Sequence, residues 1–196
     1  MPSKRPSARL AVLTESDMDA AQKKLLAALR SGPRSKSLAL QGPFAAWMHA
    51  PEFGLLAQAL GAHARYNTIL PPRLSEFAIL CTARLWRAQF EWYAHEPMAL
   101  KGGVKPKTIA DLRAGREPKS APKDERAIYA FVQELYKKRR VSDRTYKQVN
   151  ALIGDKATVE LVGICGYYAL ISMTLNVFRM LPPEDEKLAW PEPSEK

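Results

Sequence analysis

Cysteine and histidine are both scarce in this chain of 196 residues, which contains two cysteines and three histidines. Cys81 and Cys165 lie far apart and match neither a metal-binding nor a redox spacing, which excludes a disulfide scaffold as the source of stability. The three histidines show no repeated carboxylate–histidine spacing, so we expect no metal site. The low cysteine content favours a reducing compartment, and the sequence predicts a cytoplasmic protein.

Alternation of polar and apolar residues, the pattern of a half-buried strand, is also absent over any long stretch. The periodicity is helical throughout, and a hydrophobic content of 46% is enough for a substantial core. The N-terminus is basic, but its apolar run is too short for a signal peptide. We therefore predict an all-α protein with a flexible arm at 1–12, one helical domain at 13–181 and a polar tail at 182–196.

Helix boundaries are marked by capping residues, prolines and glycines. Thr14 is expected to cap a first helix at about 15–30, and Ser142 to cap a helix that runs to Ile153. A break is expected at 87–89, where one helix ends and the next begins. A short helical turn is predicted at 42–47, and the other predicted helices cover 51–66, 72–87, 88–102, 105–114, 124–138 and 156–180.

The formal net charge of +10 is spread over several segments and does not alternate with aromatic residues along one element. We therefore expect no nucleic-acid partner. A basic surface also steers small anions towards a site, so a small anionic substrate is the partner that the charge favours.

The most hydrophobic segment, at 156–180, approaches the length of a membrane span. Glu160 and Asn176 bracket it, and small or polar residues dilute it, so we expect a helix buried in a core or subunit interface and no membrane partner. Gly163 and Gly166 are expected to allow another backbone to pack closely there.

Three ionisable residues stand out in an apolar neighbourhood: Glu76, Glu91 and His95. Glu91 and His95 are four residues apart, which places a carboxylate and an imidazole on one face of a helix. Histidine titrates near neutrality, and with carboxylates beside it can act in proton transfer. We predict these three residues as the catalytic group.

The segment 70–103 resembles the carboxymuconolactone decarboxylase and alkylhydroperoxidase-D-like family. Pro-x-x-Glu opens one helix, and a second helix carries a motif that ends in histidine and leads to a glycine pair. Peroxidase members have Cys-x-x-Cys twelve residues after the glutamate and histidine four residues beyond. Counted from Glu76, those positions are Ala88, Glu91 and His95, so both motif cysteines are missing.

Loss of the cysteine pair makes dithiol peroxidase chemistry improbable, because that chemistry needs a thiolate and usually a resolving thiol. The resemblance to the decarboxylase branch implies instead an alkylhydroperoxidase-D-like bundle of about eight helices that uses no cofactor. It implies acid/base decarboxylation of a small carboxylated lactone or keto acid. His95 would donate the proton, Glu91 would orient it or act as base, and Glu76 would be the second carboxylate.

Substrate binding is predicted for residues near this motif. Arg65, Arg73 or Arg84 would clamp a substrate carboxylate, and Trp86 and Trp92 flank the site. The resemblance also implies a homo-oligomer, either a dimer, a trimer or a hexamer.

Two alternatives remain open. A peroxidase would need a reactive thiol at Cys81 or Cys165, although Cys81 falls on an apolar helix face. A non-catalytic binding protein would use Glu91 only to complement the helix dipole and His95 as a surface residue.

Overall fold

The computed structural model describes residues 5–32 and 39–192, and every regular element in these ranges is helical. The predicted all-α class is thus confirmed, with eight α-helices and no strand in the described ranges. The α-helices are α1 (Ala20–Ser31), α2 (Pro43–Trp47), α3 (Pro51–Ala62), α4 (Pro72–Trp86), α5 (Gln89–Gly102), α6 (Pro106–Arg113), α7 (Lys123–Lys138) and α8 (Asp143–Phe178). Two short turns complete the regular structure: a 3₁₀ turn, η1 (Glu15–Asp17), and a π-helical turn, η2 (His63–Asn67).

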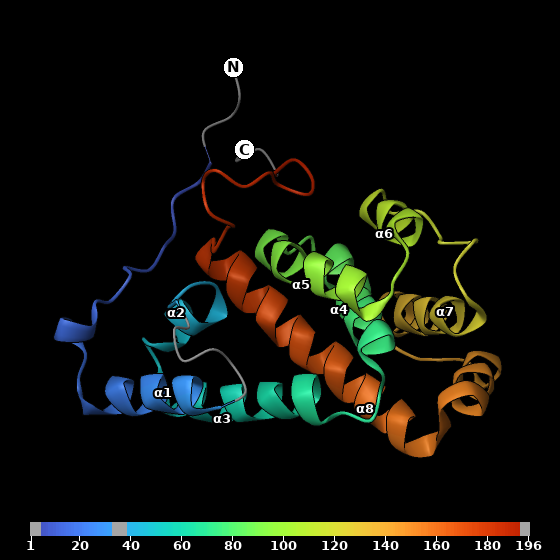
Figure 1. The fold of residues 1–196 in the computed structure, drawn as a ribbon, viewed down its shortest axis with the longest axis horizontal. Coiled ribbons are helices and arrows are strands. Elements are labelled where there is room, and N and C mark those ends of the chain that lie inside the picture. Colours follow the sequence, from blue (N-terminus) through green and yellow to red (C-terminus); the bar gives the residue numbers. More distant parts are fainter. Residues whose placement is uncertain (1–4, 33–38, 193–196) are drawn as a thin grey trace.

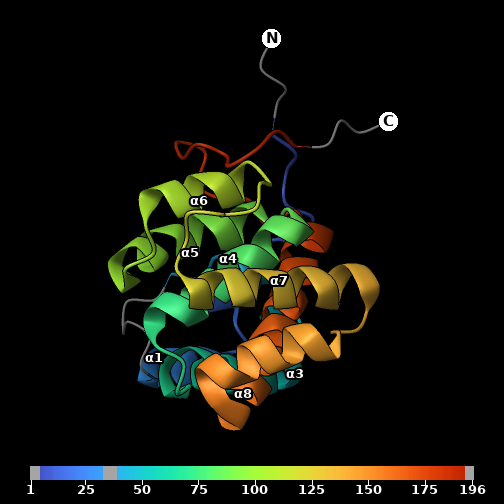
Figure 2. The same cartoon turned by 90° about the vertical axis from the view of Figure 1, so that its right-hand side faces the viewer.

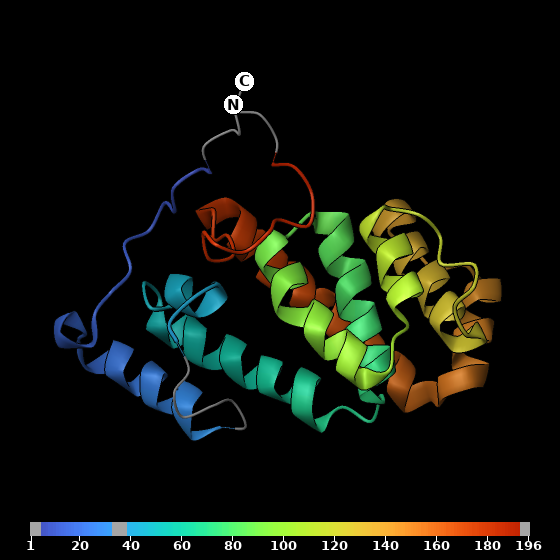
Figure 3. The same ribbon diagram turned by 45° about the horizontal axis from the view of Figure 1, so that its top comes forward.

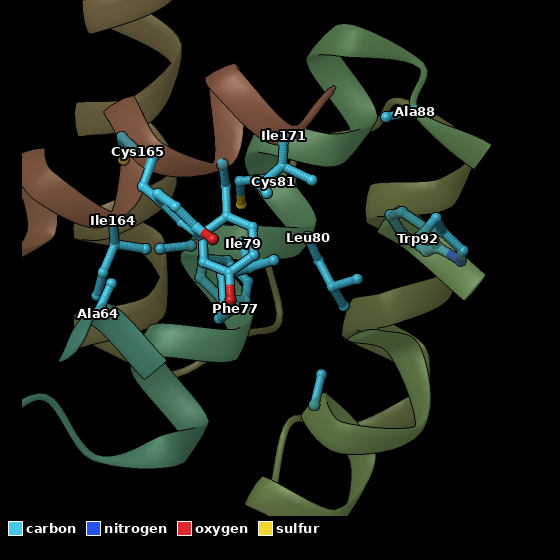
Figure 4. Close-up of a cluster of buried hydrophobic side chains, with 14 of the residues drawn as sticks. Ala64, Phe77, Ile79, Leu80, Cys81, Ala88, Trp92, Ile164, Cys165 and Ile171 are labelled. Atoms are coloured by element: carbon cyan, nitrogen blue, oxygen red, sulfur yellow. The ribbon is translucent and has the colours of Figure 1, made fainter. Parts of the chain in front are cut away.

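Helix α4 is the central element and packs against α5, α7 and α8 (Figures 1 and 2). Its residues 74–83 are all buried, so this helix is surrounded by protein on every side. Phe77, Leu80 and Cys81 of α4 join Ile164 and Ile171 of α8 in one buried cluster (Figure 4). Helices α1 and α3 pack on each other at the opposite end of the molecule from α7 (Figures 1 and 3).

The helix starts follow the residues that favour them. Proline occupies the first position of α2, α3, α4 and α6, where its missing N–H would have had no helical partner. Ser142 caps α8 as predicted, by accepting a hydrogen bond from the backbone of Thr145. The prediction of Thr14 as the first helix cap was wrong, because Asp19 and Gln22 form a reciprocal capping box that starts α1 later.

The connection between α4 and α5 is a tight turn. Arg87 adopts a left-handed conformation with φ of 52°, which ends α4, and Ala88 precedes the first residue of α5. The break predicted at 87–89 is therefore confirmed. Pro97 lies inside α5, and the helix continues past it to Gly102, where Gly103 ends it with φ of 103°.

Helix α8 contains both helices that were predicted at 142–153 and 156–180. Gly154 has φ of 78° and bends the chain sharply between them. Among the described residues, α8 is the one helix long and apolar enough to cross a membrane, with a mean hydropathy of 1.6 over its most apolar window. In that window 44% of the residues are buried, because one face of α8 packs on α4, α7 and α2.

The two ends of the described chain lie close together on the surface (Figure 1). The backbone of Arg9 donates to the carbonyl of Phe178, and the side chain of Arg5 reaches the carbonyl of Pro183. Trp190 is buried and holds the C-terminal segment against the turn between α4 and α5. Residues 1–4 of the predicted arm and 193–196 of the predicted tail lie outside the described residues, as does Pro33.

Replacing Leu80 by alanine should destabilise the fold by about 2–5 kcal/mol, because the side chain is fully buried in α4 and its loss leaves a cavity. Urea denaturation followed by circular dichroism measures the difference. Leu152→Ala, on the exposed side of α8, is the control and should change stability by about 0.5 kcal/mol or less. Equal effects of the two substitutions would contradict the central position of α4.

Candidate active site

The α4–α5 hairpin places the three predicted catalytic residues together. Glu76 lies in the second turn of α4, and Glu91 and His95 lie one turn apart on α5. All three face the interior between the two helices and are at most 7% exposed. Glu76 and His95 are 19 residues apart in the chain, so the antiparallel packing of α4 and α5 is what joins them.

His95 lies between the two carboxylates, and each ring nitrogen faces one of them. Nδ1 is 2.6 Å from Oε2 of Glu76, and Nε2 is 2.9 Å from Oε1 of Glu91. A neutral imidazole carries a single N–H and could donate to one carboxylate only. An imidazolium donates from both nitrogens, so the arrangement favours the protonated ring. We call Glu76, His95 and Glu91 the acid/base triad.

The two contacts of His95 differ in quality. The contact with Glu76 is a buried hydrogen bond. The contact with Glu91 is an ion pair at short distance, but within the described part of the chain Oε1 of Glu91 accepts no hydrogen bond of regular geometry. Oε1 of Glu91 therefore retains capacity to accept a proton or a hydrogen bond.

The pKa of His95 is set by opposing effects. Burial penalises the charged ring and by itself lowers the pKa. The negative charge of Glu91 and the hydrogen bond to Glu76 outweigh that penalty and raise the pKa to about 9. His95 is therefore protonated at neutral pH, although its ring is buried.

Tyr168 of α8 packs against the triad from a third helix, and the sequence alone did not single it out. Its ring packs edge-on against the ring of His95, with 5.0 Å between centroids. Burial raises the pKa of Tyr168 well above its usual value, and the charges of Glu91 and Glu76 add to that rise. The phenol therefore stays protonated beside the imidazolium. A tyrosine pair in an apolar helix is an ordinary core pattern, which is why the sequence did not indicate this position.

A groove of about 870 Å³ runs along the other side of α5. Its volume is in the range of small-molecule sites. None of the triad residues lines it, because the groove faces the opposite side of the helix. Its aromatic wall consists of Phe44, Phe90, Trp92 and Tyr93, and its charged residues are Arg65, Glu96, Arg113, Glu186 and Lys187.

Arg65, predicted to bind substrate, connects the groove with the triad side of α5. It lines the groove, and its guanidinium lies over the ring of Tyr66 and against the sulfur of Met98. Met98 follows His95 by three residues on α5, and the charge of Arg65 acts on Tyr168. In the described residues Arg65 forms no ion pair with a carboxylate, so its charge is available to an anion.

The other predicted substrate-binding residues are distributed differently. Trp92 lines the groove, where its indole N–H donates to Glu96 and Arg113 lies over its ring. Arg84 does not line the groove; it lies over the ring of Trp190, donates to the carbonyl of Arg113 and lines a smaller hollow of about 140 Å³. Trp86 does not line the main groove either, and its backbone carbonyl accepts from Asn176. The structure therefore brings Arg65 and Trp92 together at the groove but not Arg84 or Trp86.

Arg73 is engaged in the structure and is not a free substrate clamp. Its guanidinium pairs with Asp124 at 2.5 Å and with Glu125 at 2.6 Å. Glu125 is buried, so the pairs join the start of α4 to the start of α7. This arginine stabilises the scaffold around α4.

Both cysteines are free thiols in the core. Burial raises the pKa of Cys165 to about 12 and that of Cys81 well above its usual value. Both thiols are thus held in the protonated form. Among the described residues, no three His, Cys, Asp or Glu side chains are grouped so as to hold a metal ion.

Comparison of the sequence with known protein families and with curated proteins finds no match. The family resemblance of segment 70–103 therefore stays a prediction that rests on its own residues.

The stability of the protein should fall as the pH rises from about 6.5 to 9, because the folded state holds a proton on His95 that the unfolded chain releases. The stabilisation is fully present below pH 6.5 and is lost as the pH passes 9. The total change attributable to His95 is on the order of 3 kcal/mol. Urea denaturation at several pH values measures it.

His95→Gln should remove this part of the pH dependence, whereas His63→Gln, at an exposed histidine, should retain it. A His95→Gln protein whose stability changes with pH as the wild type does would contradict the charged state of the triad.

Proposed function

We propose that the protein catalyses acid/base decarboxylation, or a related proton transfer, on a small carboxylated lactone or keto acid without a cofactor. We further propose that its helices form an alkylhydroperoxidase-D-like bundle of the carboxymuconolactone-decarboxylase-like kind. The resemblance of segment 70–103 supports both proposals, since the α4–α5 hairpin is the unit that carries the motif.

The observation that carries the proposal is the pairing of a charged imidazole with two carboxylates in a buried position. Burying ionisable groups is costly, and perturbed pKa values in the interior are typical of functional sites. A histidine with a pKa near 9 is a proton donor at neutral pH. Glu91, whose Oε1 lies 2.9 Å from Nε2 of His95, would be the base of the same triad.

The proposed reaction on a β-keto acid needs one proton donor and no oxidant. The bond between the carboxylate and the α-carbon breaks, CO₂ leaves, and the electron pair moves into the neighbouring carbonyl to give an enolate. His95 would donate the proton of Nε2, the nitrogen whose contact with Glu91 is not a regular hydrogen bond, to the enolate carbon, which restores the carbonyl. Glu76 keeps the ring oriented, and His95 regains a proton from solvent.

The substrate would bind along α5 with a carboxylate on Arg65. The groove is lined by aromatic side chains, including Trp92, and such a wall suits a planar apolar body. Arg65 lies where the groove meets the triad side of α5, beside Met98 and near Tyr168. The reacting carbon would reach His95 at this edge, between α5 and α8.

A second candidate, a non-catalytic binding protein, is favoured by one observation. All three triad side chains are buried, and none lines the groove. In that case the triad joins α4 to α5, and Arg65 and the aromatic wall bind an anion without converting it. A peroxidase that uses Cys81 or Cys165 is the least supported alternative, because the raised pKa of each thiol opposes thiolate formation.

His95→Gln should lower kcat by about 10²–10⁴-fold on a substrate that the wild type turns over, since it removes the proton donor. A panel of β-keto acids, with oxaloacetate as the first probe, and carboxylated lactones identifies that substrate by release of CO₂. His63→Gln is the matched control and should keep kcat within about twofold of the wild type. Full activity of a folded His95→Gln protein, or no turnover across the panel, would favour the binding protein.

Arg65→Gln should raise KM by about 10–100-fold with little change in kcat, because it removes a charge that binds substrate and transition state alike. The exposed Arg140→Gln changes net charge equally and should leave KM unchanged. Made in the His95→Gln background, which should turn over little substrate, the same two substitutions can be compared by calorimetric titration with oxaloacetate. Equal affinity in the two variants would place the carboxylate elsewhere.

A further inference from the structure

The outer face of α8 carries an uninterrupted apolar stripe. Its residues recur three or four positions apart, except for one adjacent pair, and so lie on one face of the helix: Val159, Val162, Gly163, Gly166, Leu170, Met173 and Val177. The stripe is about 27 Å long at 1.5 Å per residue. None of its members carries a charge, in a chain with a net charge of +10.

Much of this α8 stripe is exposed in the single chain. Val159 is 71% exposed, and Val162, Met173 and Val177 are between 42% and 53% exposed. A Cβ built on Gly163 or on Gly166 would meet no heavy atom of the described residues within 4 Å. No other backbone of the described chain packs against these two glycines, which lie on the open face of α8.

The opposite face of α8 is committed to the core. Leu161, Ile164, Tyr168, Ile171 and Leu175 are buried there. Helix α8 therefore cannot leave the fold to cross a membrane without exposing the centre of the molecule. The stripe is an interaction surface of a helix that stays in place.

A second group of exposed apolar side chains adjoins the stripe. The backbone of Ile69 donates to Glu160, η2 packs against α8, and Gly61 near the end of α3 lies against Tyr167. Three large apolar residues of the stretch from Leu60 to Ile69 are at least 39% exposed. They are Leu60, Tyr66 and Ile69.

The combined area is sufficient for a stable interface. The exposed parts of these three side chains and of the stripe amount to on the order of 700 Å², close to the roughly 800 Å² that each partner of a standard interface buries. Single exposed apolar residues need no partner, but a set of this size indicates one.

We infer that a second copy of this chain packs on the α8 stripe, so that two α8 helices cross at Gly163 and Gly166. A two-fold contact requires a patch that is complementary to itself. The stripe meets this requirement, because its glycines lie between larger residues on both sides and let the two backbones approach closely. Because the stripe carries no charge, two copies of this basic chain can meet there without bringing like charges together. An acidic partner would instead require basic residues at the contact, and the stripe has none.

Sedimentation analysis tests the inference. The wild type should sediment as a dimer at about 50 µM, and Gly166→Leu should weaken dimerisation by about 30-fold or more, since the added side chain separates the helices. Leucine has a higher helix propensity than glycine, so this exposed substitution should not unfold α8. Circular dichroism confirms that the variant is folded.

A matched pair of charge substitutions completes the test. Val159→Glu should give a monomer, whereas Val12→Glu, at a valine that is 68% exposed outside the stripe, should remain a dimer. A wild type that is monomeric at about 50 µM would overturn the inference. So would a Gly166→Leu dimer of unchanged affinity, or a wild-type monomer that binds phosphatidylcholine vesicles through the stripe.

Discussion

The buried imidazolium between two carboxylates is the interaction on which the arrangement of α4, α5 and α8 depends. Two carboxylates at this depth would repel each other and lose their hydration, and the positive charge of His95 attracts both, at 2.6 Å from one and 2.9 Å from the other. Compensation requires that α4 and α5 remain in register, since Glu76 comes from one helix and Glu91 and His95 from the other. The extensive burial of α4 provides that rigidity.

The charged triad and the groove occupy opposite sides of α5, and this separation shapes any account of function. Arg65 is the residue that belongs to both environments, because it lines the groove and also lies against Met98 and near Tyr168. Chemistry on a bound anion would therefore take place at the edge between α5 and α8. Helix α8 borders this region; its core face is buried, and its outer face is apolar and exposed.

Helix α8 has one face buried in the core and another exposed on the surface. Its inner residues, among them Tyr168, complete the core and contact His95, and its outer stripe is exposed in the single chain, where we propose that a second copy packs. This explains why the segment is apolar on nearly all sides without being fully buried in the single chain. The bend at Gly154 ends the stripe and returns the preceding part of α8 to α7.

The sequence by itself determined the all-α class, most helix ends, and the shared helix face of Glu91 and His95, because helical periodicity, proline starts, caps and i,i+4 spacing are local properties. Only the tertiary structure decided that Glu76 and Tyr168 meet His95, that the triad faces away from the groove, and that Arg84 lies elsewhere. Those relations depend on how helices rotate and pack against one another. Packing is the sum of many weak contacts between distant parts of the chain, and no local pattern contains it.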